Sequence, residues 1–362
     1  MMIRVKIYLL ILLFLQAGTR SEAQVCNNDT SFSCLINCFN LKAIIPDVRS
    51  TDDYSVISIP YCPYDFVTNA PAITPNCISF DDKYIDTTIL PFRFCFYGQT
   101  YGKVIIGTNA LITFDSLMAL RGNNYTLTGN PIPFGGAGSI GSGNCPQPSG
   151  VNYPRASIFG AYSDIFPRSS DNFKIETRTI GVAPARIFIV SFSNVSMYGC
   201  TSQKFTSQIV IYEGTGVIDV HVQEKPTCAV TNANRAIIGI QNYARDMGVA
   251  APGRNCQPFT ATNESWRFTP NAGASRYNRV ELYKNGTLVN TGTAVSVGNS
   301  KMEATFTNVC QPETNASYVV KAYYQDCLLP GEESEFHTQI NVNKTAGPIT
   351  ATITPASCAS NM

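Results

Sequence analysis

Short apolar segments recur along this chain and are separated by clusters of Gly, Asn and Pro. The segment 186–192 (RIFIVSF) is rich in β-branched and aromatic residues, and further strands are expected at 236–240 and 265–269. No segment of about 12 or more residues repeats its apolar positions with the helical period. The pattern therefore predicts an all-β protein built as a sandwich or barrel.

Three stretches carry the turn sequences of β-hairpins. These are residues 104–114, 208–222 and 279–290, and the last contains Asn285-Gly286, the dipeptide most typical of a two-residue hairpin turn. Each turn is flanked by apolar segments that can pair as antiparallel strands. We therefore expect three local hairpins in this part of the chain.

In the second arm of the 208–222 hairpin, apolar and polar residues alternate. Ile218, Val220 and Val222 alternate with Asp219 and His221. Because successive strand residues point to opposite faces, the pattern predicts one buried face and one solvated face. His221 is accordingly expected at the surface. The other histidine, His337, has no metal-ligating neighbour at suitable spacing and is expected at the surface too.

The N-terminus has the three parts of a secretory signal. Arg4 and Lys6 supply positive charge, residues 7–15 are apolar, and Ser21 and Ala23 are the small residues of a cleavage site. The apolar stretch is too short to cross a bilayer, and no later stretch is longer. We predict a signal peptide over 1–23 and no membrane span in the mature chain.

Cysteines are numerous for an exported chain, with 13 in total. No CxxC pair is present, so disulfides are favoured over metal binding. Cys310 and Cys327 are expected to pair within one small domain, and Cys358 is expected to be the odd thiol. The disulfide candidates are Cys26, Cys34, Cys38, Cys62, Cys77, Cys95, Cys145, Cys200, Cys228, Cys256, Cys310 and Cys327.

Charge and motifs exclude several classes of function. The net charge is +1 with only 14% charged residues, which is not the basic footprint of a nucleic-acid-binding protein. Residues 136–141 match GxGxxG, but prolines on both sides leave no strand or helix to place a dinucleotide. No GxSxG nucleophile elbow occurs. The sequence therefore predicts no enzyme, no catalytic residue and no cofactor.

Two pairs of adjacent acidic residues leave alternatives to the prediction of no enzyme and no cofactor. Asp52-Asp53 and Asp81-Asp82 could act as hydrolytic carboxylates or as calcium ligands. Their spacing is not that of a calcium loop, so solvated turns are favoured and calcium stays the weaker alternative.

A few polar residues lie within apolar surroundings, where they would either pair with one another to fix loops or line a binding surface. Pairing is favoured, because Arg and carboxylates form bidentate contacts. Trp266, the only tryptophan, is expected in the core. The candidate structural polar residues are Asp164, Arg186, Glu213, Arg254, Glu264 and Arg267.

Turn-forming and linker-like residues divide the chain into five predicted parts. The signal peptide (1–23) is followed by a Cys-rich lead-in (24–80) that packs on the main domain. The main β-sandwich covers 81–270, and a small immunoglobulin-like or fibronectin type III-like sandwich covers 274–344. Residues 345–362 form a linker and the start of a truncated repeat.

A series of short motifs resembles the N-terminal domain of large surface proteins of gliding Bacteroidetes, which is itself similar to a nidogen-like domain. The resemblance covers roughly residues 77–270. It rests on the motifs at 90–98 (LPFRFCFYG), 104–114 (VIIGTNALITF), 158–165 (IFGAYSDI), 186–192 (RIFIVSF), 206–213 (TSQIVIYE), 225–228 (KPTC), 236–242 (AIIGIQN), 251–255 (APGRN) and 264–270 (ESWRFTP).

The resemblance implies a gliding-motility-type adhesin, exported by type IX secretion to the bacterial cell surface or outer membrane. Family members carry tandem repeats and a sorting domain, so the chain is expected to be truncated before them. The expected function is non-enzymatic adhesion, with a surface polysaccharide, matrix or other cell-surface component as partner. A secreted carbohydrate-active enzyme or glycan-binding accessory module is one alternative, and a purely structural stalk domain is another.

Overall fold

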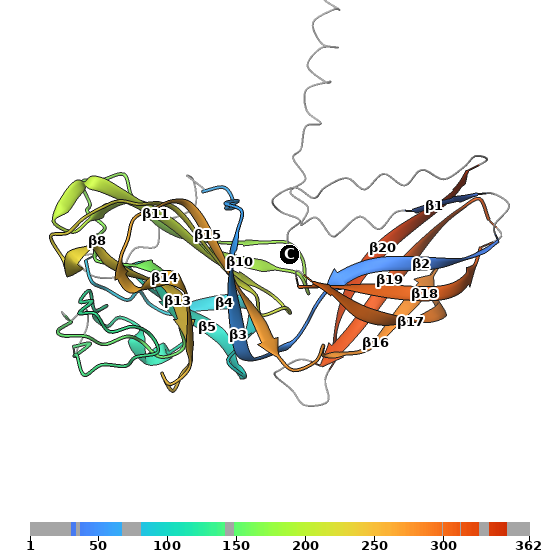
Figure 1. The fold of residues 1–362 in the computed structure, drawn as a ribbon, viewed down its shortest axis with the longest axis horizontal. Helices are drawn as coiled ribbons and strands as arrows, with labels where there is room; N and C mark the ends of the chain where they lie inside the picture. The colour runs from blue at the N-terminus through green and yellow to red at the C-terminus, as the bar shows by residue number, and fades with distance from the viewer. Residues whose placement is uncertain are drawn as a thin grey trace, which may run out of the picture.

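The computed structural model describes residues 30–33, 37–66, 81–141, 148–298, 300–311, 313–325 and 333–345. The signal peptide over 1–23 and most of the tail at 345–362 lie outside these residues, as do Cys26, Cys34, Cys77, Cys145, Cys327 and Cys358. The described chain forms strands and two short 3-10 turns, η1 (Ser116–Met118) and η2 (Asn232–Asn234), in two lobes that lie end to end (Figure 1). The expectation of an all-β sandwich is confirmed.

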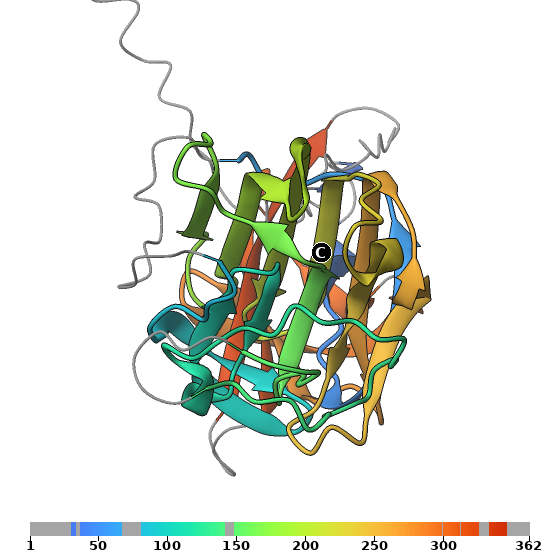
Figure 2. The same cartoon turned by 90° about the vertical axis from the view of Figure 1, so that its left-hand side faces the viewer.

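The larger domain is a sandwich of two sheets, seen end-on in Figure 2. The first sheet contains β3 (Ser50–Ile59), β8 (Ile165–Phe166), β9 (Lys174–Ile180), β10 (Ile187–Met197), β11 (Cys200–Tyr212), β12 (Ile218–Lys225) and β15 (Ala261–Ala272). Its order is β3-β15-β12-β11-β10-β8, and β9 also pairs with β10.

The second sheet of this domain has the order β14-β13-β7-β6-β5-β4. Its strands are β4 (Thr88–Phe96), β5 (Gln99–Gly107), β6 (Leu111–Thr113), β7 (Ser157–Tyr162), β13 (Arg235–Gln241) and β14 (Gly248–Pro258). The main core lies between the two sheets, where Phe94 and Ile112 of the second sheet belong to the same apolar cluster as Val190, Ile209 and Val220 of the first.

The outer faces of both sheets are also covered. Tyr64, in the coil that follows β3, donates its backbone N–H to Gln208 Oε1 at 3.0 Å, and Gln208 Nε2 returns a bond of 3.1 Å to the Tyr64 carbonyl. On the second sheet, Leu127, Ile132 and Tyr153 of the long β6–β7 connection pack against the outer side. Strands of this domain are therefore buried on both faces, as β7 is at every position.

Double-sided burial corrects the prediction for β12. Asp219 and His221 are 1% and 2% exposed, so the face expected to be solvated is buried. The alternation of residue types is present, but the coil after β3 shields this face. His221 Nδ1 lies 2.7 Å from Ser265 Oγ, and burial lowers the pKa of His221. His337 is exposed, as expected.

The second domain is one sheet of seven strands in the order β1-β20-β19-β16-β17-β18-β2. β17 pairs with β16 through its first half and with β18 through its second half, so the sheet folds over an apolar core that includes Leu41, Leu282, Phe306 and Val320. The strands are β1 (Thr30–Ser33), β2 (Cys38–Pro46), β16 (Tyr277–Lys284), β17 (Thr287–Gly298), β18 (Lys301–Cys310), β19 (Asn315–Gln325) and β20 (Glu333–Thr345).

This domain is assembled from both ends of the chain. β2 pairs antiparallel with β18, and the disulfide Cys38–Cys310 joins them across 272 positions. The larger domain is thus inserted between β2 and β16. The expected lead-in over 24–80 is not one unit, because β2 belongs to the second domain whereas β3 pairs with β15 of the larger domain.

Two further expectations about cysteines are wrong, namely the pairing of Cys310 with Cys327 and the place of Cys256 among the disulfide candidates. Cys310 pairs with Cys38, so it does not pair with Cys327. Cys256 is a free, buried thiol 3.7 Å from the Tyr153 hydroxyl. Cys200 and Cys228 form a disulfide within the larger domain, and Cys62 and Cys95 are also disulfide-bonded.

The three expected hairpins are confirmed as β5–β6, β11–β12 and β16–β17. In the last of them, Asn285 and Gly286 both have positive φ angles, 51° and 79°. This is the conformation that a two-residue type I′ turn requires, and it explains why the dipeptide signal was informative.

Candidate functional site

The two domains meet where the tip of the β11–β12 hairpin approaches β19 and β20. Gly214 at this tip has a φ of 73°, and a Cβ there would lie 2.7 Å from both the Tyr324 hydroxyl and Phe336 Cζ. Tyr324 and Phe336 stack with ring centroids 5.2 Å apart, and Val48, in the segment between β2 and β3, packs with them. Only glycine permits this close approach without displacement of the aromatic pair.

Two short tethers connect the domains at the same place. The first follows β2 and contains Asp47 and Val48, and the second precedes β16 and contains Arg276. The Arg276 backbone N–H donates to the Val48 carbonyl at 2.8 Å, and the Tyr277 hydroxyl donates to the Pro46 carbonyl at 2.7 Å. One main-chain bond therefore joins the two tethers, and a side-chain bond from β16 to the end of β2 lies beside it.

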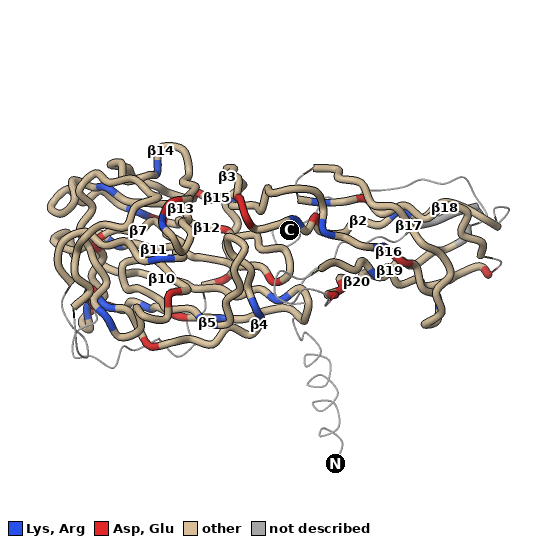
Figure 3. The backbone as a smooth tube through the Cα atoms, turned by 90° about the horizontal axis from the view of Figure 1, so that it is seen from below, with Lys and Arg blue, Asp and Glu red and all other residues tan. Residues whose placement is uncertain are grey.

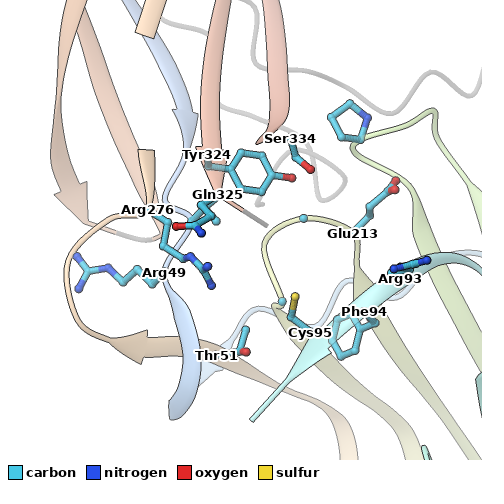
Figure 4. A pocket seen from close by; sticks show the side chains of 14 residues that line it. Arg49, Thr51, Arg93, Phe94, Cys95, Glu213, Arg276, Tyr324, Gln325 and Ser334 are labelled. Atoms are coloured by element: carbon cyan, nitrogen blue, oxygen red, sulfur yellow. The ribbon is translucent and has the colours of Figure 1, made fainter. Parts of the chain in front are cut away.

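A cavity of about 200 Å³ lies at this junction, and we call it the junction cavity. Figure 4 shows that both domains supply its wall. The larger domain contributes Arg93, Phe94 and Glu213, and the second domain contributes Tyr324, Gln325 and Ser334. Arg276 of the second tether completes the wall.

The charges around the junction cavity are mainly positive. Glu213 is held by Arg186 in a bidentate ion pair, with Nε–Oε2 and Nη2–Oε1 distances of 2.8 and 2.6 Å. Arg49 donates from Nε to Asp47 Oδ2 at 2.8 Å, and its guanidinium points away from the cavity in Figure 4. Arg93 and Arg276 approach the cavity from opposite sides. Because a guanidinium has five N–H donors, these two groups supply donors from both domains.

The described wall carries little that could perform chemistry. Its one carboxylate, Glu213, is engaged by Arg186, whereas hydrolysis of a glycosidic bond uses two carboxyl groups on opposite sides of the bond. Its one cysteine, Cys95, is disulfide-bonded. The arrangement suits binding of a small polar group.

Comparison with known families identifies the larger domain. A family model described as NIDO related matches residues 54–274, which run from within β3 to just beyond β15. The chain belongs to the NIDO-related family. No curated protein and no solved structure matches it. The NIDO-related domain is therefore the inserted, larger domain. The match ends within the second tether, and the second domain lies outside the matched residues.

No helix among the described residues is long and apolar enough to cross a membrane.

A second polar site lies inside the NIDO-related domain. The adjacent residues Asp81 and Asp82 meet Asp164 from a distant part of the chain, and the charges of the three carboxylates influence one another. The pKa of Asp82 is raised to about 8, first by burial and then by the negative charges of Asp81 and Asp164. Burial likewise raises the pKa of Asp164 to about 7 and that of Asp81 to about 6.

Hydrogen bonds fix this carboxylate cluster in place. Asn109 Nδ2 donates to Asp82 Oδ1 at 2.9 Å, and the Asn109 carbonyl oxygen of the side chain accepts from the Ile165 N–H at 3.1 Å. Among the residues that the structure describes, no group of three or more His, Cys, Asp or Glu side chains could hold a metal ion. The cluster thus joins two features of the sequence, the Asp81-Asp82 pair and Asp164, without forming a metal centre. Asp52 and Asp53 lie exposed on β3, where Ser50 Oγ donates to Asp52 Oδ2 at 2.6 Å.

The remaining candidate polar residues take part in two ion pairs, one between β14 and β15 and the other between β12 and β15. Arg254 makes a bidentate contact to Glu264 at 2.8 and 2.7 Å, and Trp266 Nε1 donates to the same carboxylate. Trp266 is half-buried and packs at the margin of the core. Arg267 makes a bidentate contact to Asp219, both distances being 2.7 Å.

Sequence reasoning missed three residues of these sites. Asp219, the partner of Arg267, was expected in solvent, although its place in an apolar strand is the type of signal that singled out Asp164. Arg93 and Arg276 carried no local signal. They lie far apart in the chain, and the junction that brings them to one cavity depends on the insertion of one domain into the other.

Proposed function

We propose that this protein is an exported, non-enzymatic binding module of the cell surface, in which the NIDO-related domain and the second domain act as one rigid unit in adhesion. The NIDO-related match over 54–274 carries the proposal, because nidogen-like domains belong to extracellular proteins. The disulfides Cys38–Cys310 and Cys200–Cys228 support it, since such bonds persist in oxidising compartments.

The bacterial setting is a finer part of the same proposal. The motif series of the NIDO-related domain resembles surface proteins of gliding Bacteroidetes, and we infer a gliding-motility-type adhesin that is exported by type IX secretion. Antibody labelling of intact cells of the producing organism tests this placement. Labelling of intact cells is expected, and labelling only after lysis would contradict it.

The binding function has a direct test. The purified, oxidised protein should bind cells, matrix or surface polysaccharide in a pull-down with immobilised ligand, and reduction with denaturation should abolish the binding. A protein that retains its disulfides and folded spectrum, yet binds none of these surfaces, would contradict the adhesion role. Both domains belong in the tested protein, because β2 and β16–β20 form a domain only together.

A further inference from the structure

We propose that the junction cavity binds one small anionic group of an acidic polysaccharide, a sulfate ester or a uronate carboxylate, between Arg93 and Arg276. This inference rests on the proposed function and names the ligand class for it. The two arginines approach the cavity from opposite sides, one from β4 and one from the second tether (Figure 4). A ligand there contacts both domains at once.

The choice of an anion follows from the donor chemistry. Arg presents planar N–H pairs that match the oxygens of carboxylate, phosphate and sulfate groups. Glu213, the one acidic side chain in the wall, is already paired with Arg186. A guanidinium that makes one other contact still has donors left, because one carboxylate uses at most two of its five N–H groups. The described wall therefore offers donors to an incoming oxyanion, and its one carboxylate is already paired.

The size of the cavity selects a small group. Its volume of about 200 Å³ is below the roughly 300 Å³ at which sites for drug-sized ligands begin. It would hold about six water molecules at their volume in the liquid. A sulfate or carboxylate group, with part of the sugar ring that carries it, is of this size, whereas a chain of several sugars must extend outside.

Neutral groups around the arginines suit a sugar. Thr51 and Ser334 bring hydroxyls and Gln325 brings an amide to the same cavity, and each can donate to or accept from a sugar hydroxyl. The Tyr324 ring lies near Gln325 and Ser334 and forms an apolar part of the wall. A mixture of charged and neutral polar groups around one aromatic ring favours a glycan anion over a bare inorganic ion.

The test is a titration of the full chain, with intact disulfides, against three probes. These are a sulfated oligosaccharide, a uronate oligosaccharide and a neutral oligosaccharide of the same length, each at low and high salt. The acidic probes should bind and lose affinity as salt rises, and the neutral probe should bind at least tenfold more weakly. Inorganic sulfate, as a fourth probe, should compete with the acidic oligosaccharides.

Variants assign the binding to the cavity. Arg93→Gln and Arg276→Gln should each weaken binding about ten- to hundredfold, the range for loss of a hydrogen bond to a charged group. Arg93→Lys keeps the charge but not the planar donor pair, so it should fall between wild type and Arg93→Gln. Arg155→Gln is the matched control, because it removes the same charge from a residue that does not line the cavity.

Circular dichroism and melting temperature show whether each variant is folded, and Arg93→Lys tests the site if a glutamine variant unfolds. Equal affinity of wild type and both glutamine variants would overturn the inference, as would equal binding of acidic and neutral probes. Failure of all anionic probes would also overturn it. Binding to cells or to the neutral glycan in the same preparation would then leave the adhesion role intact, whereas loss of all binding would remove both.

Discussion

The two domains treat ionisable side chains in opposite ways. The NIDO-related domain buries Asp82, Lys83, Asp164, Asp219 and Arg267, each at most 8% exposed. Among the strand residues of the second domain whose burial the structure describes, no Asp, Glu, Lys, Arg or His side chain is buried, and ion pairs such as Lys42–Glu303 lie at the surface. Asp47, in the first tether, is buried and pairs with Arg49. Figure 3 shows charged positions of both signs along both domains, so the difference is one of depth.

The difference follows from how each sheet is covered. The NIDO-related domain covers the outer faces of its sheets with the coil after β3 and the β6–β7 connection, so polar residues of either face are enclosed. The second domain leaves its outer face in solvent. Buried charges respond strongly to a lost partner and to pH, whereas exposed pairs contribute little. Sensitivity to mutation of charges and to pH should therefore be concentrated in the NIDO-related domain.

The largest effect is expected from Arg267→Met. It leaves Asp219 buried without its counter-charge, which should lower the free energy of unfolding of the NIDO-related domain by about 3–5 kcal/mol. Arg254→Met is the matched control, since the Arg254–Glu264 pair is partly exposed and should cost about 1 kcal/mol. Denaturant unfolding followed by Trp266 fluorescence reports on this domain. Equal costs for the two variants would show that depth does not decide the outcome.

Loss of the Cys38–Cys310 disulfide should lower the free energy of unfolding of the second domain by a similar amount. The double variant Cys38→Ser/Cys310→Ser should destabilise that domain by about 2–5 kcal/mol, because its strands then come together from two unlinked parts of the chain. Calorimetry should show the transition of the second domain shifted and that of the NIDO-related domain retained. Cys200→Ser/Cys228→Ser should do the reverse, and a shift of both transitions in either variant would contradict independent stabilisation.

Gly214→Ala tests the contact between the domains. Its Cβ would collide with Tyr324 and Phe336 at a positive φ, which should cost about 1–3 kcal/mol and loosen the junction. Gly286→Ala is the control, because Gly286 has a similar φ but open space around it. Faster hydrogen exchange at β19 and β20 in the first variant alone is expected. Identical behaviour would attribute the effect to backbone strain.

The smallest effect is a change with pH. Burial raises the pKa of Asp82 to about 8, far above the usual value, so the folded state binds a proton that the unfolded state releases above pH 4. The contribution of protonated Asp82 to the free energy of unfolding is therefore complete below about pH 4. It decreases as the pH rises and is lost once the pH passes about 8. Asp82→Asn should therefore be more stable than wild type by at least about 1 kcal/mol at pH 9 and nearly equal to it at about pH 3, below both pKa values of this group. A variant that is less stable than wild type at pH 9 would show that the charged carboxylate stabilises the fold.

The sequence predicted the features that depend on near neighbours. The hairpins at 104–114, 208–222 and 279–290 follow from turn residues next to alternating strands, and the absence of helical periodicity indicated an all-β chain. Arg254 and Glu264 were singled out because charged residues in apolar surroundings must find partners. Trp266, expected in the core, lies half-buried at its margin.

What the sequence did not predict depends on distant segments. Period-two alternation places Asp219 and His221 on one face, but it does not say that the coil around Tyr64 covers that face. An odd number of cysteines predicts one free thiol, yet it does not single out Cys256. The pairing of β2 with β18 joins residues separated by the whole larger domain, and no local pattern marks either partner.

The Cys38–Cys310 disulfide also determines which residues bear a mechanical force that is applied along the chain. Tension applied to the chain before Cys38 and after β20 passes through sulfur from β2 to β18 and leaves residues 39–309 out of the path. The NIDO-related domain lies wholly within that closed loop. Under the proposed adhesive role, a pull along the chain would therefore leave the NIDO-related domain out of the covalent path, while β19 and β20 of the second domain, which supply part of the junction-cavity wall, bear the force.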